Sequence, residues 1–459
     1  MSASKIVAGI AVWMITAVTL VAQQQHANVP HKSDARIVAA MQKVSAERLR
    51  KNDEKLVSFG TRHTLSVQLP ADAAGGITKA AAWIKEELEG YSKACGGCLE
   101  VKTQTELQEK ANRIPEPIQL TNVYAVQRGT DPESAKRIIV ISGHYDSRNS
   151  ETNDYSKPAP GANDDGSGTI TVLETARVLS QYKFPATIVY LTVAGEEQGL
   201  YGSKQFAKMA KANGWNMDAV LNNDIVGGDK SPGQDATKVR VFSEGVPSNA
   251  TPEQVRKIRG LGEENDSASR ELARYVNEIG GQYSAGPRFR PVMVFRPDRY
   301  LRGGDHLSFN EEGFAAVRFT EWQENFNHQH QTPRTENGIE YGDLPKFVDF
   351  GYVARVAKLE VAVLASLASG PAAPARPRLL TKSLENDSQL AWDASPTGQV
   401  AYYEVVWRST TEPTWTQDKR VGTETTAKLP VSKDNVVFGI RAVDAQGHRS
   451  IVVTPVPER

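Results

Sequence analysis

The chain has 459 residues, which is longer than one average domain and indicates two or three domains. Lys and Arg together number 54, as do Asp and Glu, so the formal net charge is zero and no general basic surface for nucleic acid is expected. Hydrophobic residues make up 39% of the chain, which is enough to fill a substantial core. The composition therefore argues against nucleic acid or another polyanion as the partner.

The first 22 residues have the pattern of an export signal. Lys5 precedes an apolar run of 17 residues, and three glutamines follow that run. We interpret residues 1–22 as a signal peptide that is removed from a periplasmic or extracellular protein. An uncleaved membrane anchor is the alternative, because 17 residues is the lower limit for a spanning helix. No later segment reaches that length, so no membrane span is expected after signal removal.

Residues 32–114 are expected to form a helical segment that packs on the catalytic sheet. Residues 34–54 and 76–91 both carry apolar side chains at helical spacing. The two cysteines of the chain, Cys95 and Cys98, flank two glycines, which allow a turn tight enough for a local disulfide in an exported protein. A half zinc site and a redox pair are the alternatives, and neither has supporting residues nearby.

Residues 115–369 are expected to form the catalytic domain, because strands alternate there with helices. The strands are predicted at residues 122–127, 137–142, 187–193, 219–223, 239–242, 291–295 and 315–319. The helices are predicted at residues 168–180, 203–211, 269–279 and 350–368. This alternation predicts an α/β fold with a mostly parallel, mixed sheet flanked by helices.

A second, smaller domain is expected at the C-terminus. Residues 370–378 are rich in proline and alanine and are predicted to be a linker. Residues 379–459 alternate apolar and polar side chains with a period of two and show no helical pattern, which predicts a β-sandwich. With Trp392 on its second strand and residues 403–407 and 438–444 on later strands, this part resembles a fibronectin type III domain.

Two adjacent carboxylates follow the most apolar strand of the predicted sheet. Residues 187–193 have the β-branched content of a buried parallel strand, and Glu196 and Glu197 come directly after it. Ligands of open α/β sheets gather at the carboxyl ends of the strands. Neighbouring side chains point in different directions, so one carboxylate could bind a metal while the other faces the substrate. A solvated acidic turn is the alternative for this pair taken alone.

Other segments bring histidine and aspartate to the same edge. His144 and Asp146 follow residues 137–142, a spacing that suits a metal ligand and a carboxylate that orients it. Asp164 and Asp165 lie in a glycine-rich turn before a helix, where the two oxygens of one aspartate could bridge two cations. Taken alone, His144 would serve equally well as a structural histidine, and the glycine-rich turn as a helix cap.

The set is completed by residues much later in the chain. Asp224 ends the fourth of these strands, and a loop at residues 325–333 contains His328 and His330. So many coincidences at one sheet edge indicate a metal site rather than several solvated turns. Histidine and carboxylate donors without thiolate favour zinc, with cobalt and manganese as rivals. One bridging aspartate with two further ligands for each ion describes a two-metal site for hydrolysis.

The motifs together resemble the co-catalytic zinc aminopeptidase family, which also contains glutamate carboxypeptidases and glutaminyl cyclases. They are residues 144–147, 161–165, 195–199 and 223–224 and the histidine-rich loop at 325–333. The similarity covers residues 120–368, and the motifs are specific as a set although each is weak alone. The resemblance implies a zinc exopeptidase-like fold for this part of the chain.

The resemblance also implies two zinc ions and five ligands. One ion would be held by His144 and Asp224, the other by Glu197 and His330, and Asp164 would bridge them. The peptide bond after the bridging aspartate is often cis in the family, so a cis bond is expected at this position.

Further roles follow from the same resemblance. Glu196 would be the general base, which takes a proton from the metal-bound water and returns it to the leaving amine. Asp146 would orient His144. Asp305 and His306 resemble a segment that lines the family's pocket, and we expect them behind the ligands rather than among them.

The last ligand and the pocket wall are less sharply defined by the motifs. Gln331 separates His330 from Thr-Pro, where the family usually has histidine directly before threonine, so His328 is a rival to His330. His330 is preferred because it lies closer to the Thr-Pro landmark. The long insertion at residues 227–302 is expected to build the wall of the substrate pocket.

These observations predict an exported two-zinc exopeptidase that acts on peptides with a free N-terminus. A carboxypeptidase is less favoured because the motifs place no arginine pair for a C-terminal carboxylate. A glutaminyl cyclase is less favoured because five ligands and Glu196 suit hydrolysis better. From another class, an inert peptidase-like adhesion or binding protein would use the β-sandwich for its contacts, but the presence of Glu196 argues against it.

Overall fold

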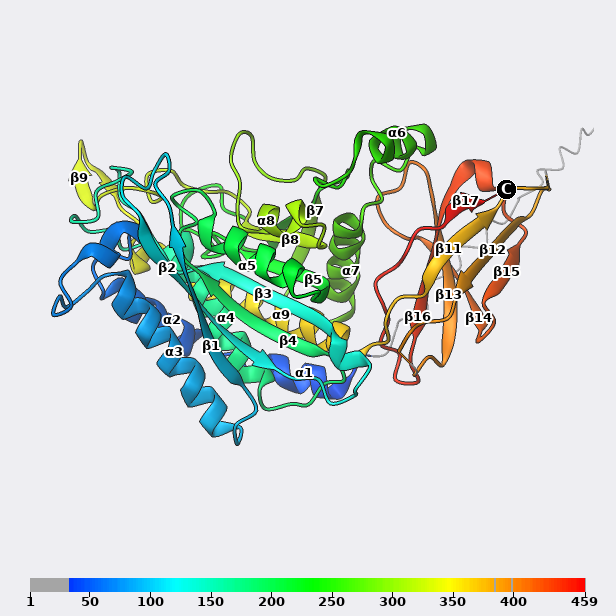
Figure 1. Cartoon of the computed structure of the whole chain (residues 1–459), viewed down its shortest axis with the longest axis horizontal. Coiled ribbons are helices and arrows are strands. Elements are labelled where there is room, and N and C mark those ends of the chain that lie inside the picture. The colour runs from blue at the N-terminus through cyan, green and yellow to red at the C-terminus, as the bar shows by residue number, and fades with distance from the viewer. Residues whose placement is uncertain (1–32, 384, 398, 459) are drawn as a thin grey trace, which may run out of the picture.

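The computed structural model describes residues 33–383, 385–397 and 399–458. Figure 1 shows a large sheet with flanking helices and, beside it, a smaller all-β unit in orange and red. Residues 1–22, the predicted signal peptide, lie outside the described residues, so export stays a prediction. Within the described part of the chain, no helix has the length and apolar content that a membrane span requires.

One mixed sheet of eight strands organises the larger body, in the order β1-β2-β4-β3-β5-β8-β6-β7. Its strands are β1 (Glu100–Gln108), β2 (Ile118–Gln127), β3 (Arg137–His144), β4 (Thr187–Val193), β5 (Asn216–Asn223), β6 (Lys238–Phe242), β7 (Arg290–Val294) and β8 (Ala316–Glu321). The central strands β4, β3, β5 and β8 are parallel, whereas β1 and β2 are antiparallel additions at one edge and β6 is antiparallel to β8. The predicted α/β fold with a mostly parallel, mixed sheet is confirmed.

Helices cover both faces of this sheet because its central strands are apolar on both faces. In β3, Ile139 and Ile141 pack in one core with α4 (Ser167–Leu179) and α9 (Phe350–Ser369). Val140 points the other way and packs with α5 (Tyr201–Ala212) and the short α8 (His306–Glu311). All seven residues of β4 are buried, which explains its unbroken apolar run.

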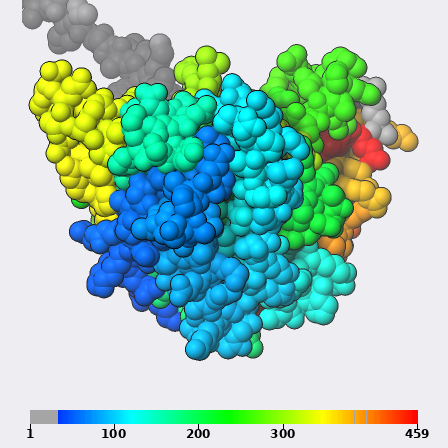
Figure 2. Space-filling view, turned by 60° about the vertical axis from the view of Figure 1, so that its left-hand side comes forward, coloured from blue at the N-terminus to red at the C-terminus, as the bar shows by residue number. Residues whose placement is uncertain are grey.

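The N-terminal segment packs on the larger body, but it is not wholly helical. Its helices are α1 (Ala35–Gln42), α2 (Ala46–Val57) and α3 (Ile77–Ala94), which contact α4 and α9. Residues 34–54 form two helices rather than one, because Ser45 caps α2 by accepting the N–H of Arg48. Residues 100–108 form the edge strand β1, and Figure 2 shows this strand region in cyan beside the blue N-terminal helices. Cys95 and Cys98 form the predicted disulfide after α3.

The C-terminal unit is a β-sandwich, as predicted, with sheets in the orders β15-β12-β11-β17 and β14-β13-β16. Its strands are β11 (Ala375–Leu380), β12 (Ser388–Asp393), β13 (Tyr402–Ser409), β14 (Gln417–Gly422), β15 (Thr426–Leu429), β16 (Val436–Val443) and β17 (Val456–Glu458). Trp392 and Tyr403, one from each sheet, meet edge to face with ring centroids 5.6 Å apart. The likeness to a fibronectin type III domain stays a prediction.

The boundary of the predicted linker needs a correction. Strand β11 begins at Ala375, inside the proline- and alanine-rich tract 370–378. Pro377 is tolerated because the pairing of β11 with β12 shifts register between Ala375 and Arg378, where the missing N–H of proline is not needed.

Buried charges fix the sandwich to α7 (Ala268–Gln282) of the larger body. Arg408 of β13 pairs with Asp266, two residues before this helix begins, and each side chain is only 3% exposed. Arg441 of β16 pairs with Glu278 at 2.8 Å. The remaining elements of the body are α6 (Pro252–Leu261) and a hairpin of β9 (Arg334–Glu336) and β10 (Ile339–Tyr341).

Candidate metal centre

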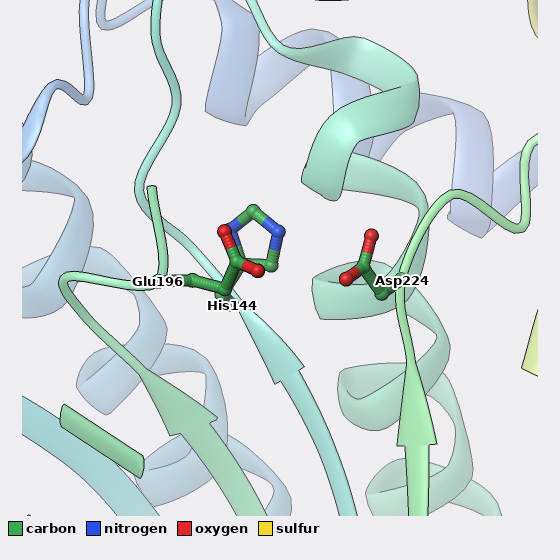
Figure 3. Close-up of side chains that lie close together, drawn as sticks. All are labelled: His144, Glu196 and Asp224. Atoms are coloured by element: carbon green, nitrogen blue, oxygen red, sulfur yellow. The ribbon is translucent and has the colours of Figure 1, made fainter. Parts of the chain in front are cut away.

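Three neighbouring parallel strands bring donor side chains to one point of the sheet edge. His144 is the last residue of β3, Glu196 lies in the turn after β4, and Asp224 directly follows β5. Figure 3 shows the carboxylate of Asp224 across from the His144 ring, with Glu196 beside that ring. One potential ligand atom from each residue lies within 4.8 Å of the other two. The gathering follows from topology, because the carboxyl ends of parallel strands meet at one edge.

A second group of donors lies next to the first. Asp164, Glu197 and His330 also have ligand atoms within 4.8 Å of one another. Asp164 connects the groups, since its Oδ1 is 3.2 Å from His144 Nε2 and its Oδ2 is 2.8 Å from His330 Nε2. His330 Nε2 is also 2.9 Å from Glu197 Oε1. The peptide bond after Asp164 is cis, as predicted.

The two groups have the properties of a cation site. His144 Nε2 and Glu197 Oε1 are buried and make no hydrogen bond of ordinary geometry, although each has a polar neighbour nearby. Burial lowers the pKa of His330, but the carboxylates of Glu197 and Asp164 outweigh it and raise that pKa to about 10. Such a concentration of negative charge favours a bound cation. Histidine and carboxylate donors without thiolate fit zinc.

Glu196 and Glu197 lie in different environments despite being neighbours. Both line a cavity, but Glu197 is buried whereas Glu196 is half-buried. Burial raises the pKa of Glu196 well above its usual range, with His144 opposing the rise and Asp224 adding to it. A carboxyl group that binds protons this strongly is suited to proton transfer, and cations bound beside it would oppose the rise in its pKa.

Asp146 links the ends of β3 and β4. Its Oδ1 is 3.5 Å from His144 Nδ1, and its backbone carbonyl lies 3.1 Å from the same nitrogen. Its carboxylate also accepts the backbone N–H groups of Glu196 at 3.3 Å and Glu197 at 3.2 Å, and the hydroxyl of Thr64 at 2.9 Å. Asp146 therefore contacts both segments that carry the donors.

The structure separates the two histidines of the late loop. His330 joins the second donor group, whereas His328 stacks on Phe347 with ring centroids 3.6 Å apart and contacts Asp229 at 2.6 Å. His328 belongs to neither donor group among the described residues. The backbone of His330 is left-handed, with φ of 53°, a conformation that costs about 1 kcal/mol or more for a residue other than glycine.

Asp305 and His306 are both fully buried behind the donors. His306 Nε2 is 2.8 Å from the carbonyl of Pro297, and neither residue is among those that line the cavity. Burial raises the pKa of Asp305 to about 7. That Asp305 and His306 support the ligands stays a prediction.

Two supporting residues were not identified from the sequence. Arg62 is fully buried and donates to the carbonyls of Tyr145, Pro160 and Gly161, which lie in the loops that carry the donors. Asp343 accepts the N–H groups of Asn163 and Asp164, both at 2.7 Å. Arg62 stands in a Phe-Gly-Thr-Arg-His run that is visible in the sequence, but Asp343 lies 179 positions from Asp164 and carries no local signal.

Two more buried residues, Arg318 and Asp165, contact the donor residues directly. Arg318 of β8 pairs with Asp224 at 2.8 Å and with Asp298 at 3.1 Å. Asp165 accepts the backbone N–H of His144 at 3.0 Å, which ties the glycine-rich turn to the end of β3. Asp165 is the last residue of the motif at 161–165, whereas Arg318 lies within a strand and could not be distinguished from an ordinary core residue.

A cavity of about 580 Å³ opens over the donor groups. It is lined by Asp164, Glu196, Glu197, Asp224 and His330, together with several cationic side chains. The insertion at residues 227–302 contributes Arg299, Leu301 and Arg302 to its wall, in agreement with the expectation from the sequence. A larger hollow of about 670 Å³ lies around Asp34 and His448 and contains none of the donors.

Comparison with solved structures defines the fold class. The aminopeptidase LapA of Legionella pneumophila has a TM-score of 0.51 and 20% identity, and the match covers 80% of each chain. The aminopeptidase of Aneurinibacillus sp. strain AM-1 has a TM-score of 0.50 and 15% identity, covering 73% of this chain and 96% of that one. The larger body therefore has the fold of this class of aminopeptidases.

Comparison with other sequences defines the family. Residues 122–347 match peptidase family M28. A probable zinc metalloprotease of Pyrenophora teres f. teres is 44% identical over 434 residues, covering 94% of this chain and 88% of the relative. A probable zinc metalloprotease of Pyricularia oryzae is 45% identical over 437 residues, covering 92% of this chain and 85% of the relative. The chain belongs to peptidase family M28.

Proposed function

We propose that this chain is a zinc metallopeptidase that removes residues from peptides with a free N-terminus. Zinc is supported by the names of its relatives and by the histidine and carboxylate donors. Action at the N-terminus is supported by the family motifs and by the fold shared with aminopeptidases.

The proposed site holds two zinc ions, one on His144 and Asp224 and one on Glu197 and His330. The observation that carries this proposal is the position of Asp164, whose two oxygens face His144 and His330 at 3.2 and 2.8 Å. Cobalt and manganese are suited to the same donors. When bound, the ions would polarise the peptide carbonyl and lower the pKa of a bound water.

Glu196 is the proposed general base. It is within 4.8 Å of the His144 and Asp224 donor atoms and lines the open cavity, so it can reach both a bound water and the substrate. It takes the proton of the attacking water and returns it to the leaving amine. Asp146 has a positioning role, because it contacts His144 Nδ1 and holds the backbone N–H of Glu196.

Cleavage at the C-terminus is a second candidate, and one observation favours it. Arg113, Arg148, Arg299 and Arg302 line the cavity, whereas the motifs alone had identified no arginines for a terminal carboxylate. N-terminal cleavage is still preferred, because LapA and the Aneurinibacillus enzyme, which share the fold, are aminopeptidases.

The test is release of leucine from a leucyl peptide amide, compared with its N-acetylated form, with and without a chelator. We expect release from the free peptide only, and its loss on chelation. Glu196→Gln should lower kcat by about 10²- to 10⁴-fold while the zinc content is retained. Glu47→Gln, at an exposed ion pair with Lys51 far from the site, is the matched control.

Four outcomes would contradict the proposal. Activity that survives chelation would exclude a metal mechanism. Near-full activity of Glu196→Gln would exclude Glu196 as the general base. Release of C-terminal residues from N-acetylated peptides with a free carboxylate would select the carboxypeptidase instead. No hydrolysis of any peptide would favour an inert binding protein.

A further inference from the structure

Five cations line the cavity over the donor groups: Arg113, Arg148, Lys204, Arg299 and Arg302. The carboxylates that line the same cavity are Asp164, Glu196, Glu197 and Asp224, and all belong to the donor groups. Two bound zinc ions would balance the charge of those carboxylates. The cations are then left without matching negative charge inside the cavity.

Three of these cations have no acidic partner. Arg113, Arg148 and Lys204 are half-buried, and no carboxylate in the described part of the chain lies within 4.0 Å of their charged nitrogens. They contact backbone carbonyls instead: Arg113 donates to Glu197 at 2.8 Å and Lys204 donates to Gly199 at 3.1 Å. Arg148 donates to the next carbonyl at 3.4 Å. Each side chain keeps further N–H groups for a ligand.

The part of the wall formed by Arg299 and Arg302 is also short of negative charge. Arg299 and Arg302 both pair with Glu324, at 2.9 and 2.7 Å. Arg240 pairs with the same carboxylate at 3.1 Å. The other acid beside Arg299 is Asp298, which it shares with Arg318. The field of this wall therefore adds to that of the three unpaired cations, and low-dielectric walls focus such a field into the cavity.

We propose that Arg113, Arg148 and Lys204 recognise a second carboxylate of the peptide substrate. The carboxylate is either an acidic side chain or the terminal carboxylate of a short peptide, since both offer the same two oxygens to a guanidinium or ammonium group. A carboxylate supplies the charge that the cavity lacks, and it does so where solvent is partly excluded and attraction is strong. The inference rests on the proposed function, because the peptide is the substrate named there.

The test uses three peptides that release leucine and differ only in their carboxylates. Leu-Gln-amide has none, Leu-Glu-amide has one on its side chain, and Leu-Gln has one at its terminus. We expect kcat/KM for at least one of the charged peptides to exceed that for Leu-Gln-amide by 10-fold or more. The charged peptide that gains identifies the source of the carboxylate, and the gain should shrink as salt is raised.

Charge-removing variants then locate the effect. Arg148→Gln and Lys204→Gln should each lower the ratio of kcat/KM between charged and neutral peptides by 3-fold or more. The ratio is used because it is insensitive to a general loss of activity. Lys79→Gln, on an exposed face of α3, removes the same charge elsewhere and should leave the ratio unchanged. Arg113→Gln provides a third comparison.

Binding without turnover separates this inference from the proposed function. Calorimetric titration of the Glu196→Gln protein should show tighter binding of the charged peptides, by 10-fold or more, and Arg148→Gln in that background should remove the difference. Equal binding and equal kcat/KM for all three peptides would overturn the carboxylate site. If no peptide releases leucine but the charged ones still bind more tightly, the proposed function fails and the carboxylate site stands.

Discussion

Replacement of Arg62 by lysine should loosen the loops that carry the donors. The guanidinium of Arg62 is fully buried and donates to Tyr145 at 2.8 Å, Pro160 at 2.6 Å and Gly161 at 2.8 Å. The first carbonyl lies next to His144, and the other two lie in the turn that leads to Asp164. One side chain therefore fixes the segments of both donor groups.

The magnitude follows from these three bonds. A hydrogen bond from a charged donor contributes about 1.5–3 kcal/mol. The lysine ammonium is a compact charge rather than a planar fork, so Arg62→Lys keeps one or two of the bonds and should lose about 3 kcal/mol of folding free energy. Arg62→Met leaves all three carbonyls buried without a donor and should lose about 5 kcal/mol.

Thermal unfolding and zinc content per chain are the measurements. Arg62→Lys should lower Tm by roughly 5 °C or more and reduce the zinc retained after dialysis. Arg128→Lys is the matched control. Arg128 is exposed and its ion pair with Glu100 is at the surface, so the Tm of this variant should change little. If Arg62→Lys had the wild-type Tm and zinc content, the buried guanidinium would not be what holds the donor loops.

Three further predictions concern single side chains. His330→Gln should lose one zinc per chain while His328→Gln keeps both, by metal analysis, and equal losses would reopen the choice between these histidines. Arg408→Met leaves Asp266 buried with less compensation and should lower the free energy of unfolding by about 3 kcal/mol without changing zinc content, whereas an unchanged Tm would mean that this ion pair is not stabilising. Burial lowers the pKa of His448, but the carboxylates of Asp444 and Asp34 outweigh it, so the folded-state pKa lies above the ordinary 6.5. The stabilisation by His448 is thus complete below about pH 6.5 and is lost as pH rises through the folded pKa, so Tm should fall over that interval in the wild type and less in His448→Gln.

The donor residues could be predicted from the sequence because they lie close to strands that their apolar pattern makes recognisable. His144, Glu196 and Asp224 each follow an apolar run, and the parallel topology that brings their ends together is itself implied by alternating strands and helices. The residues that hold the donor segments in place could not be predicted in this way. Arg62 and Asp343 act on backbone carbonyls and amides of distant segments, so no pattern of side chains records their contacts.

The same distinction explains the errors in the fold. The residues of β1 are all exposed or half-buried, so this edge strand lacks the apolar alternation by which a strand is recognised. Strand β11 contains Pro377 within a tract that has the composition of a linker, and only the irregular pairing with β12 makes a strand possible there. Strands that depend on how they pair with a neighbour are thus harder to predict from the sequence than elements that are defined by burial.

Removal of the metal should destabilise the protein, and more so as pH rises. Without cations, the carboxylates of Asp164, Glu196, Glu197 and Asp224 stand close together with only partial compensation from His144, His330 and Arg318. Burial raises the pKa of Asp224 to about 6, with Arg318 opposing the rise and Asp164 adding to it. An acid whose folded pKa is raised costs no stability below its unfolded pKa, near 3.8, and destabilises increasingly as pH rises from there through its folded pKa of about 6.

Bound zinc offsets this repulsion and, at a free concentration of 100 times its Kd, stabilises the fold by about 2.7 kcal/mol. The difference in Tm between zinc-loaded and chelated protein should therefore widen from pH 5 to pH 7. Chelated Glu196→Gln should be more stable at pH 7 than chelated wild type, because glutamine carries no charge and needs no proton at a position where burial disfavours the charged carboxylate. A Tm that does not respond to chelation anywhere in this range would mean that the clustered donors are held apart by the fold alone and need no cation.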